Sequence, residues 1–495
     1  MPFIGRAFSD ALIETASAQE KGAPFEAATV RAMARELAQK PYRAPDNKLP
    51  DVLKDLSYDR YRMIRFKPDQ AYWRNDGLPF QLQFFHRGFY YTNRVDVFEV
   101  KEGLAFPILY TPNMFAFGDQ PVPDIQGNLG FAGFRIHGPI NRPDYFDEIG
   151  VFLGASYFRA VAKNQVYGLS ARGLSIKTAD PTGEEFPVFK SFWIERPAKN
   201  ANSLVVHALL DSESATAAYR FTIRPGETTT FDIEVALFPR VQIDQPGLAT
   251  LTSMYFFGPN DRRGVDDFRP AVHDTVGIAI QNGRGEQIWR PVSNPTDLQV
   301  SAFVDNSPRG FGLMQRERSF RQYEDLEARY EKRPSAWIEP IGNWGDGEVR
   351  LVEIPTSTEI NDNIVAFWRP KNPTRAKGEY VYTYRIHWGS RIPAPMPLAQ
   401  VVATRIGAGP EDTRQIVIDF AGENLRGVPP AEIKANVSND KGQLRNIVVH
   451  GNPEIAGQRL TVQLAPGNEK VVELRAQLMR GDDALSEAWL YRWTP

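Results

Sequence analysis

Cysteine is absent from the 495 residues of this chain. The sequence therefore excludes disulfides, thiol chemistry and any Cys-based metal site, while leaving the cellular compartment open. No apolar stretch approaches the roughly 20 residues that are needed to cross a bilayer. Residues 1–24 do not show a cationic segment followed by an apolar core, so we expect no intact signal peptide there.

An excess of charge of either sign is also absent. The chain has 58 basic and 60 acidic residues and a formal net charge of −2, without a polybasic run. This balance disfavours nucleic acid as a partner and provides no basic segment for a membrane surface.

Histidine is scarce, with six residues in the chain. His86 and His137 have no second histidine at a metal-ligand spacing, so we expect both to be structural and no metal to be bound. The fingerprints of serine hydrolases, phosphate-binding loops and dinucleotide sites do not occur in their proper context, and we expect no cofactor. Gly283-Arg284-Gly285 has no following helix and is interpreted as a hairpin turn.

The chain is instead rich in strand signals, and its length predicts two domains. Extended apolar runs separated by Pro, Gly, Asn and Asp recur through most of the sequence, as in GFRIHG, QVYGL, EVRLVEI, NIVAFW and EYVYTYRIHW. Two longer runs flank Pro225-Gly226 and predict a hairpin. One amphipathic helix is expected within residues 25–40, before Pro41. The pattern predicts an all-β protein with a large β-sandwich.

A change in composition falls at residues 389–398, GSRIPAPMPL, where three prolines predict a stiff connector. Beyond it, about seven strand signals in about a hundred residues are typical of a small immunoglobulin-like sandwich. We therefore expect a domain over residues 25–388, a linker over 389–398 and a second domain over 399–495.

Two loop-like segments, residues 261–274 and 358–370, place acidic residues beside aromatic and basic ones at the edges of strands. Asp274 lies in the first segment and Asp362 in the second. Two loop carboxylates in an aromatic-rich β-protein suit acid/base chemistry on a sugar, in which one assists the leaving oxygen and the other activates water. The alternative for each is a solvated surface carboxylate.

Other acidic residues compete for these roles. Asp266 and Asp267 are rivals for the base, and their structural alternative is a turn or an ion pair with Arg262, Arg263 or Arg269. Three further carboxylates lie in a short helix-like stretch, where solvated charge is the ordinary role: Glu324, Asp325 and Glu327.

Several long segments resemble one family, the periplasmic glucan biosynthesis family OpgG/OpgD, also called MdoG. The resemblance runs from about residue 25 to the C-terminus, and the segments that carry it are residues 78–91, 130–160, 165–174, 184–197, 306–340 and 353–368.

The resemblance implies a galactose-mutarotase-like N-terminal sandwich joined to the immunoglobulin-like one. It implies action on β-1,2-glucan as an inverting endo-glucanase or transglycosylase, with Asp362 as general acid, Asp274 as general base and Tyr330 as a cleft residue that helps the proton relay. An inverting pair of carboxyl groups is roughly 6.5–9.5 Å apart, leaving room for water.

Candidate substrate-binding residues are aromatic or basic, because aromatic rings can stack on the apolar face of a pyranose and arginine can bond hydroxyls. For the tryptophans the alternative is a place in the core, and for the arginine it is surface solvation. The candidates are Tyr323, Arg309, Trp337, Trp344 and Trp368.

Three functions stay open from the sequence. The first is the enzyme described above. The second is a non-catalytic scaffold that presents nascent glucan for branching or modification, and a third is an epimerase or mutarotase, suggested by the fold alone. The family also implies a periplasmic location and contact with the membrane glucan synthase, and it allows a homodimer.

Overall fold

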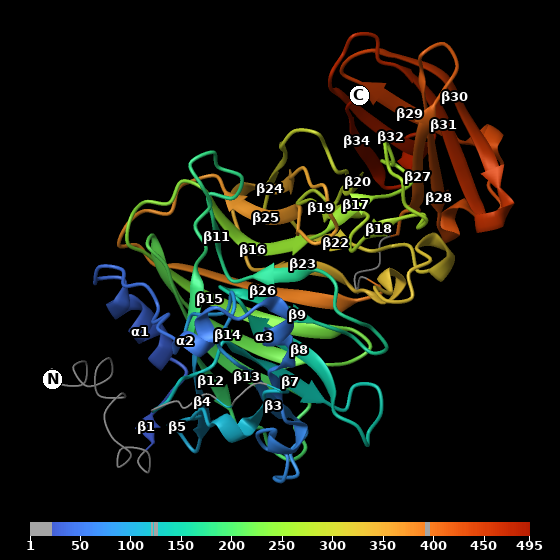
Figure 1. Cartoon of the computed structure of the whole chain (residues 1–495). Coiled ribbons are helices and arrows are strands. Elements are labelled where there is room, and N and C mark those ends of the chain that lie inside the picture. The colour runs from blue at the N-terminus through green and yellow to red at the C-terminus, as the bar shows by residue number, and fades with distance from the viewer. Residues whose placement is uncertain (1–21, 120–121, 123–126, 392–396) are drawn as a thin grey trace.

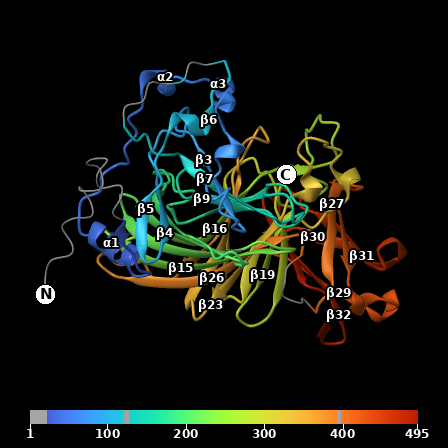
Figure 2. The ribbon, with the colours of Figure 1, turned by 90° about the horizontal axis from the view of Figure 1, so that it is seen from below.

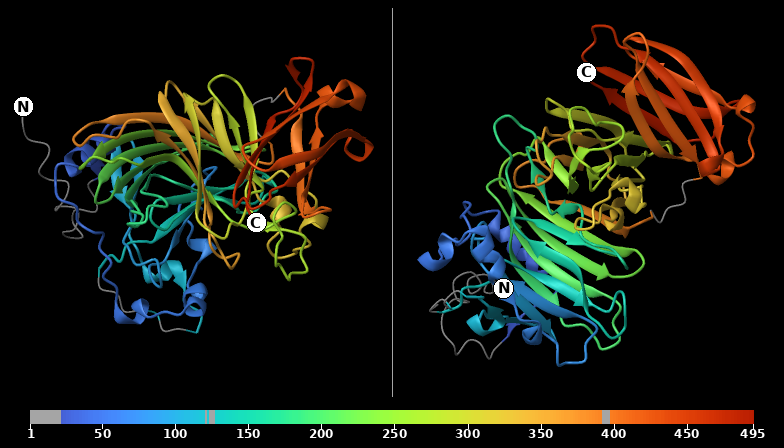
Figure 3. Two further views of the ribbon diagram at one scale, coloured as in Figure 1. Left: turned by 90° about the horizontal axis from the view of Figure 1, so that it is seen from above. Right: turned by 45° about the vertical axis from the view of Figure 1, so that its right-hand side comes forward.

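The computed structural model describes residues 22–119, 122, 127–391 and 397–495. Strands dominate this part of the chain, as the sequence predicts. Residues before the connector fold into two stacked sheets, and the C-terminal residues form a smaller sandwich at one end of them (Figures 1 and 3).

The first large sheet continues from the N-terminal strands into the C-terminal sandwich. Its N-terminal part is ordered β1 (Ala23–Pro24), β5 (Leu104–Pro107), β4 (Asp96–Lys101), β12 (Val188–Glu195), β13 (Leu204–Asp211), β14 (Ala215–Arg224), β15 (Thr229–Pro239), β26 (Tyr380–Gly389), β23 (Ser335–Ile341), β22 (Gly310–Met314), β19 (Gly277–Gln281) and β20 (Gln287–Pro291).

The second sheet stacks on the first. It is ordered β21 (Gln299–Asn306), β24 (Asp346–Glu353), β25 (Ile364–Pro370), β16 (Pro246–Ser253), β10 (Ser170–Arg172), β9 (Tyr157–Ala160), β8 (Asp147–Leu153), β7 (Gly133–Gly138) and β3 (Gln81–Phe85), with β11 (Ser175–Ile176) also paired to β16. Two small pairs complete this region: β17 (Tyr255–Phe257) with β18 (Val272–His273), and β2 (Arg65–Phe66) with β6 (Phe115–Ala116).

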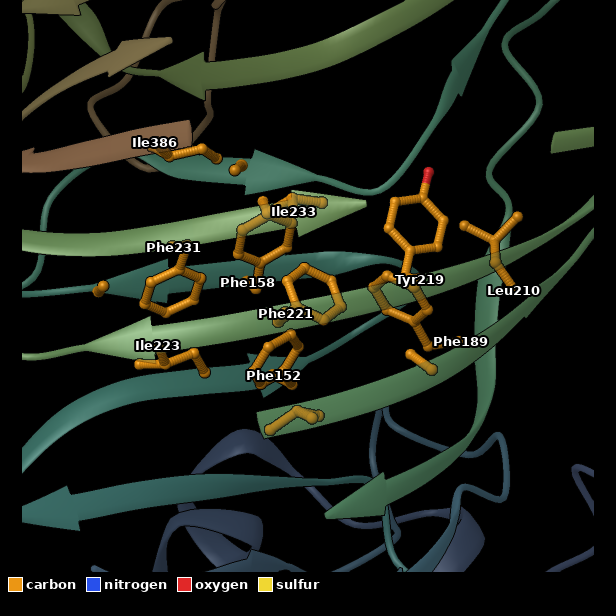
Figure 4. Close-up of a cluster of buried hydrophobic side chains, with 14 of the residues drawn as sticks. Phe152, Phe158, Phe189, Leu210, Tyr219, Phe221, Ile223, Phe231, Ile233 and Ile386 are labelled. Carbon is orange, nitrogen blue, oxygen red and sulfur yellow. The ribbon is translucent and has the colours of Figure 1, made fainter. Parts of the chain in front are cut away.

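Alternating aromatic and branched residues fill the space between the two sheets. Phe221 on β14 lies opposite Ile233 on β15, so both project from one face. From the second sheet, Phe152 on β8 and Phe158 on β9 place their ring centroids 5.2 and 5.3 Å from that of Phe221 (Figure 4). Side chains of two inner faces that interdigitate in this way form the core of a β-sandwich.

Short helices lie outside the sheets. The predicted helix is α1 (Thr29–Leu37), and its Val30 and Ala34 are buried against Trp193 and Phe238 of the first sheet. The prediction of a short amphipathic helix is thus confirmed. Helices α2 (Asp51–Lys54) and α3 (Tyr58–Met63) lie on the side of the molecule away from the C-terminal sandwich (Figure 2).

Seven single-turn 3₁₀ helices punctuate the loops of the described residues. They are η1 (Pro68–Gln70), η2 (Pro112–Met114), η3 (Phe320–Gln322), η4 (Tyr330–Lys332), η5 (Glu423–Leu425), η6 (Pro430–Glu432) and η7 (Pro453–Ile455). The stretch with Glu324, Asp325 and Glu327 lies between η3 and η4 and is a turn.

The C-terminal sandwich has two layers. One is ordered β27 (Gln400–Ala408), β28 (Arg414–Ala421), β31 (Gly457–Ala465) and β30 (Gln443–Asn452), and the other contains β34 (Ala488–Trp493), β32 (Val472–Arg480), β29 (Lys434–Asn439) and β33 (Asp483–Ala484). Residues 392–396 of the predicted connector lie outside the described residues.

The two sandwiches share a sheet and a core, which the prolines of the connector did not lead us to expect. β34 pairs in parallel with β20, so that Trp489 lies opposite Trp289. The C-terminal hydrophobic core also contains Trp337 and Met314 of the N-terminal sandwich. The predicted boundary therefore separates two segments of sequence that are joined laterally by hydrogen bonds and packing.

Candidate functional site

The candidate site is built where β16 ends. The backbone N–H of Asp274 donates to the carbonyl oxygen of Met254 at 2.8 Å, and the hydroxyl of Thr252 donates to Asp362 Oδ2 at 3.5 Å. Because Thr252 and Met254 are two residues apart, one strand end brings together two aspartates that are distant in sequence.

Asn363 fixes the loop that carries Asp362. Its side-chain oxygen accepts from the backbone N–H of Tyr255 at 2.8 Å, and its amide donates to the carbonyl oxygens of Tyr255 and Ile354 at 2.9 and 3.1 Å. Asn363 is buried, whereas Asp362 beside it is exposed. The start of β25 is therefore held in place while the neighbouring carboxyl faces solvent.

Asp274 is 5% exposed, and burial raises the pKa of its carboxyl to about 6. The ion pair with Arg333 opposes this increase in pKa, and the negative charge of Asp362 adds to it. Burial has the larger effect, since loss of water penalises the charged form of a carboxyl. The end of β16, which contacts both aspartates, is the structural basis for this effect of Asp362 on Asp274.

Tyr330 lies over the arginine that holds Asp274. The Arg333 guanidinium is 4.4 Å from the centroid of the Tyr330 ring, and Arg333 Nε donates to the carbonyl oxygen of Ala328 at 3.0 Å. The Tyr330 hydroxyl donates to Glu359 Oε2 at 3.4 Å. Burial raises the pKa of Tyr330, so its hydroxyl keeps its proton at neutral pH.

The structure thus brings Asp274, Asp362 and Tyr330 into one neighbourhood. Asp274 responds to the charge of Asp362, and Tyr330 responds to the charge of Asp274. The loop with η3 and η4, yellow in Figure 1, lies between the second sheet and the C-terminal sandwich.

Tyr323 is buried beside this site. It is 0% exposed, and its ring centroid is 5.3 Å from that of His273 and 5.8 Å from that of Tyr330. Its hydroxyl donates to the carbonyl oxygen of Glu317 at 3.3 Å. A side chain packed in this way supports Tyr330 and presents no face to a sugar.

The prediction that three tryptophans stack on a sugar is wrong, because all three are buried. Trp368 is 0% exposed and Trp344 is 6% exposed, both in the main core, and Trp337 is 2% exposed in the core of the C-terminal sandwich. Packing covers their rings, so none offers a face for stacking.

Arg309 is exposed but lies elsewhere. It precedes β22 and is beside the turn between β19 and β20, whereas Gln315, which follows β22, donates to the His273 carbonyl oxygen at 2.7 Å. The length of β22 therefore separates Arg309 from the aspartates. The turn that contains Gly283 and Gly285 does connect β19 to β20, as predicted.

Two of the rival carboxylates take structural roles, and the others are exposed. Asp267 forms an ion pair with Arg269 at 2.8 Å, and Asp325 forms another at 2.9 Å. Asp266 and Glu324 are exposed.

The histidines are also structural, as predicted. His86 Nε2 is 2.9 Å from the Tyr110 hydroxyl, and burial lowers the pKa of His86 to about 4. His137 Nδ1 is 3.3 Å from the carbonyl oxygen of Phe146. Within the described residues, no group of three or more His, Cys, Asp or Glu side chains could hold a metal ion.

Sequence reasoning missed Arg333, Glu359 and Thr252, because a single charged residue in a loop or a threonine near the end of a strand has no distinctive spacing. The triplet Asn361-Asp362-Asn363 did contain a signal, since asparagine often bonds backbone groups at the boundary of an element.

Residues 22–119, 122, 127–391 and 397–495 include no helix that is both long and apolar enough to cross a membrane.

Comparison with known proteins identifies the family of this chain. The model of the family described as "Periplasmic glucan biosynthesis protein, MdoG" matches residues 25–493. The chain belongs to this family.

Individual relatives are similar over nearly the whole chain. The chain is 58% identical to a glucans biosynthesis protein G of Rhodopseudomonas palustris strain BisA53, over 100% of this chain and 97% of that protein. It is 57% identical to one of Bradyrhizobium diazoefficiens, over 95% and 94% of the two chains. It is 51% identical to one of Vibrio cholerae, over 96% and 88%.

Proposed function

We propose that this chain acts in the periplasm on linear β-1,2-glucan, as an inverting endo-glucanase or transglycosylase. The observation that carries the proposal is the pair of aspartates joined by the end of β16, one buried with a raised pKa and one exposed. Family membership supports glucan as the ligand.

Asp362 is the proposed general acid. It donates its proton to the departing glycosidic oxygen while the bond from the anomeric carbon to that oxygen breaks. The carboxyl is exposed in the free chain. This exposure leaves the carboxyl accessible to a bound glucan.

Asp274 is the proposed general base. A carboxyl with a pKa of about 6 is ionised at neutral pH and is a stronger base than an ordinary aspartate. Asp274 takes a proton from the water that attacks the anomeric carbon. Because its side chain is nearly covered, we propose that Tyr330 and water or a sugar hydroxyl relay the proton.

The test is a product assay on β-1,2-glucan with detection of the anomer. Proton NMR of the first products should show the α-anomer, because one displacement at a β-linkage inverts the anomeric carbon. An initial β-anomer would contradict inversion. New reducing ends indicate hydrolysis, and longer or cyclic products without new reducing ends indicate transfer.

The second candidate is a glucan-binding scaffold without turnover. It is favoured by the covering of the site, in which Asp274 is 5% and Tyr330 3% exposed. Binding of β-1,2-glucan of any length without cleavage would select the scaffold.

Under either candidate we propose the membrane glucan synthase as partner. Sedimentation of the purified chain would test for a homodimer.

A further inference from the structure

Arg269 contacts carboxylates from three different loops. Its Nη2 is 2.8 Å from Asp267 Oδ2, and its Nη1 is 2.9 Å from both Asp325 Oδ2 and Glu359 Oε2. The Arg269 side chain is 13% exposed, so its contacts with Asp267 and Asp325 are largely shielded from water, whereas the Glu359 side chain is 39% exposed. The guanidinium therefore joins the loop between β17 and β18, the loop between β22 and β23, and the loop between β24 and β25.

Two of these loops carry Tyr330 and Asp362, and the third leads through the two-residue strand β18 to Asp274. Arg269 comes five residues before Asp274, Asp325 five before Tyr330, and Glu359 three before Asp362. Hydrogen bonds extend the link from Arg269 toward these proposed groups.

Asp325 Oδ1 accepts from the backbone N–H of Glu327 and of Ala328, at 3.0 and 2.7 Å. The carbonyl oxygen of Ala328 accepts from Arg333, which in turn holds Asp274. Glu359 Oε2 accepts a hydrogen bond from the Tyr330 hydroxyl and also forms the ion pair with Arg269.

Burial of apolar side chains contributes little to holding the tips of these loops in place. The neighbours of the three bonded residues point to solvent: Phe268 is 81%, Leu326 77% and Ile360 86% exposed. The loop with Glu359 is held at one end by Thr356, whose N–H donates to Asn294 Oδ1 at 3.0 Å, and at the other end by Asn363 and the bond from Thr252 to Asp362. Residues 357–362 are therefore the segment that depends most on the contact with Arg269.

We propose that Arg269 is a positioning residue that fixes these three loops to one another, so that Asp274, Tyr330 and Asp362 form one site. The assignment of those three residues rests on the proposed function. A lysine could not reproduce the arrangement, because a guanidinium presents several donors in a fixed plane and an ammonium is a single point charge.

The direct test is hydrogen–deuterium exchange of the full chain. In Arg269→Lys, the hydrogen-bonded amides of the two segments should exchange roughly ten- to hundredfold faster, the range expected for losing a hydrogen bond to a charged group. These are the amide of Thr358 in residues 357–362 and the amides of Glu327, Ala328 and Arg329 in residues 325–330. In Glu359→Gln, residues 357–362 should respond while 325–330 keep the wild-type rate. This variant changes one partly exposed arm of the cluster, so it keeps the test open if Arg269→Lys folds poorly.

A kinetic test adds a readout that a general loss of stability would not give. Arg269→Lys and Glu359→Gln should each lower kcat about tenfold or more, because small displacements of reacting groups are costly, with little change in KM. The double variant should be no slower than Arg269→Lys alone, since both changes break the same link.

The matched control is Arg220→Lys, which alters an arginine–glutamate pair on the first sheet, and it should leave exchange and kcat unchanged. Wild-type exchange rates at 357–362 in both Arg269→Lys and Glu359→Gln would overturn the positioning role. Lack of turnover by the wild type would instead defeat the proposed enzyme function, and the exchange result would still decide the role of Arg269.

Discussion

At the scale of single residues, Asp362 differs from the other groups of the site because it is exposed and is not paired with a cation in the described contacts. Asp362→Asn keeps the shape of the side chain but cannot donate an acidic proton. We expect the rate of glucan cleavage to fall by about 10²–10⁴-fold, the usual contribution of general acid–base catalysis. Reducing-end assays measure the rate, and titration calorimetry should show that glucan binding is kept.

Glu324→Gln is the control for this change, because Glu324 is an exposed carboxylate on a neighbouring loop that makes no side-chain bond among the described contacts. It should retain wild-type turnover. Cleavage by Asp362→Asn at the wild-type rate would show that the acid is another residue.

The pKa of Asp274 leads to a pH prediction with a definite sign. A base must be ionised to act, so kcat/KM should increase with pH through about 6 and level off above it. Arg333 lowers the pKa of Asp274, so Arg333→Gln should move this acidic limb to higher pH. A pH series of kcat/KM for both proteins measures the two limbs, and a limb that moves to lower pH would contradict the assignment.

The sequence could nominate residues by chemical type but could not report their surroundings. Asp274 and Asp362 stood out because acidic loop residues beside strands suit sugar chemistry. The tryptophans stood out for an equally general reason, and Trp368 proved to be fully buried. Burial depends on contacts between distant segments, which a local pattern does not contain.

At the scale of elements, Asn363 connects β25 to its neighbours through three buried backbone contacts. Asn363→Ala would leave those backbone groups unsatisfied. We expect it to lower the free energy of unfolding by about 1–3 kcal/mol, the typical penalty for a buried unpaired polar group. Urea unfolding measures this change.

Asn361→Ala is the matched control, because Asn361 is exposed two residues earlier in the same loop. It should change the free energy of unfolding by no more than about 0.5 kcal/mol. Equal effects of the two substitutions would indicate that the loop responds to any change, and not to the bonds of Asn363.

Individual strands were predictable where alternation was regular. GFRIHG is β7, and NIVAFW and EYVYTYRIHW overlap β25 and β26 closely. QVYGL is not a strand. The N–H of Val166 donates to the carbonyl oxygen of Lys332, and that of Gln165 to the carbonyl oxygen of Ala162. A strand needs a neighbour in register, and the sequence does not say which segments acquire one.

At the scale of the whole molecule, the seam between the sandwiches, where β20 pairs with β34, is the feature least visible in the sequence. The prolines near residues 389–398 indicated a change of domain, but the pairing of β20 with β34 joins residues about 200 positions apart. The seam also buries an ion pair, Arg316 with Glu487, whose closest atoms are 2.5 Å apart. Local patterns cannot predict contacts of this sequence separation.

This ion pair should determine how the two sandwiches unfold. Arg316 also stacks on Trp289 at 3.6 Å, and Glu487 accepts the backbone N–H of Val401 at 2.7 Å, so the pair links β20, β27 and the start of β34. Glu487→Gln leaves the buried guanidinium without its charge partner. Breaking a buried pair on one side typically costs about 3–5 kcal/mol.

We expect wild-type protein to unfold in one calorimetric transition, because the sandwiches share a sheet and a core, and Glu487→Gln to unfold at lower temperature in two. Glu432→Gln removes one side of an exposed pair with Arg480 and is the control, with an expected cost of no more than about 1 kcal/mol. Two well-separated transitions in the wild type would mean that the seam does not couple the sandwiches. A Glu487→Gln profile identical to the wild type would mean that packing around Trp289 and Trp489 holds the seam without help from the ion pair.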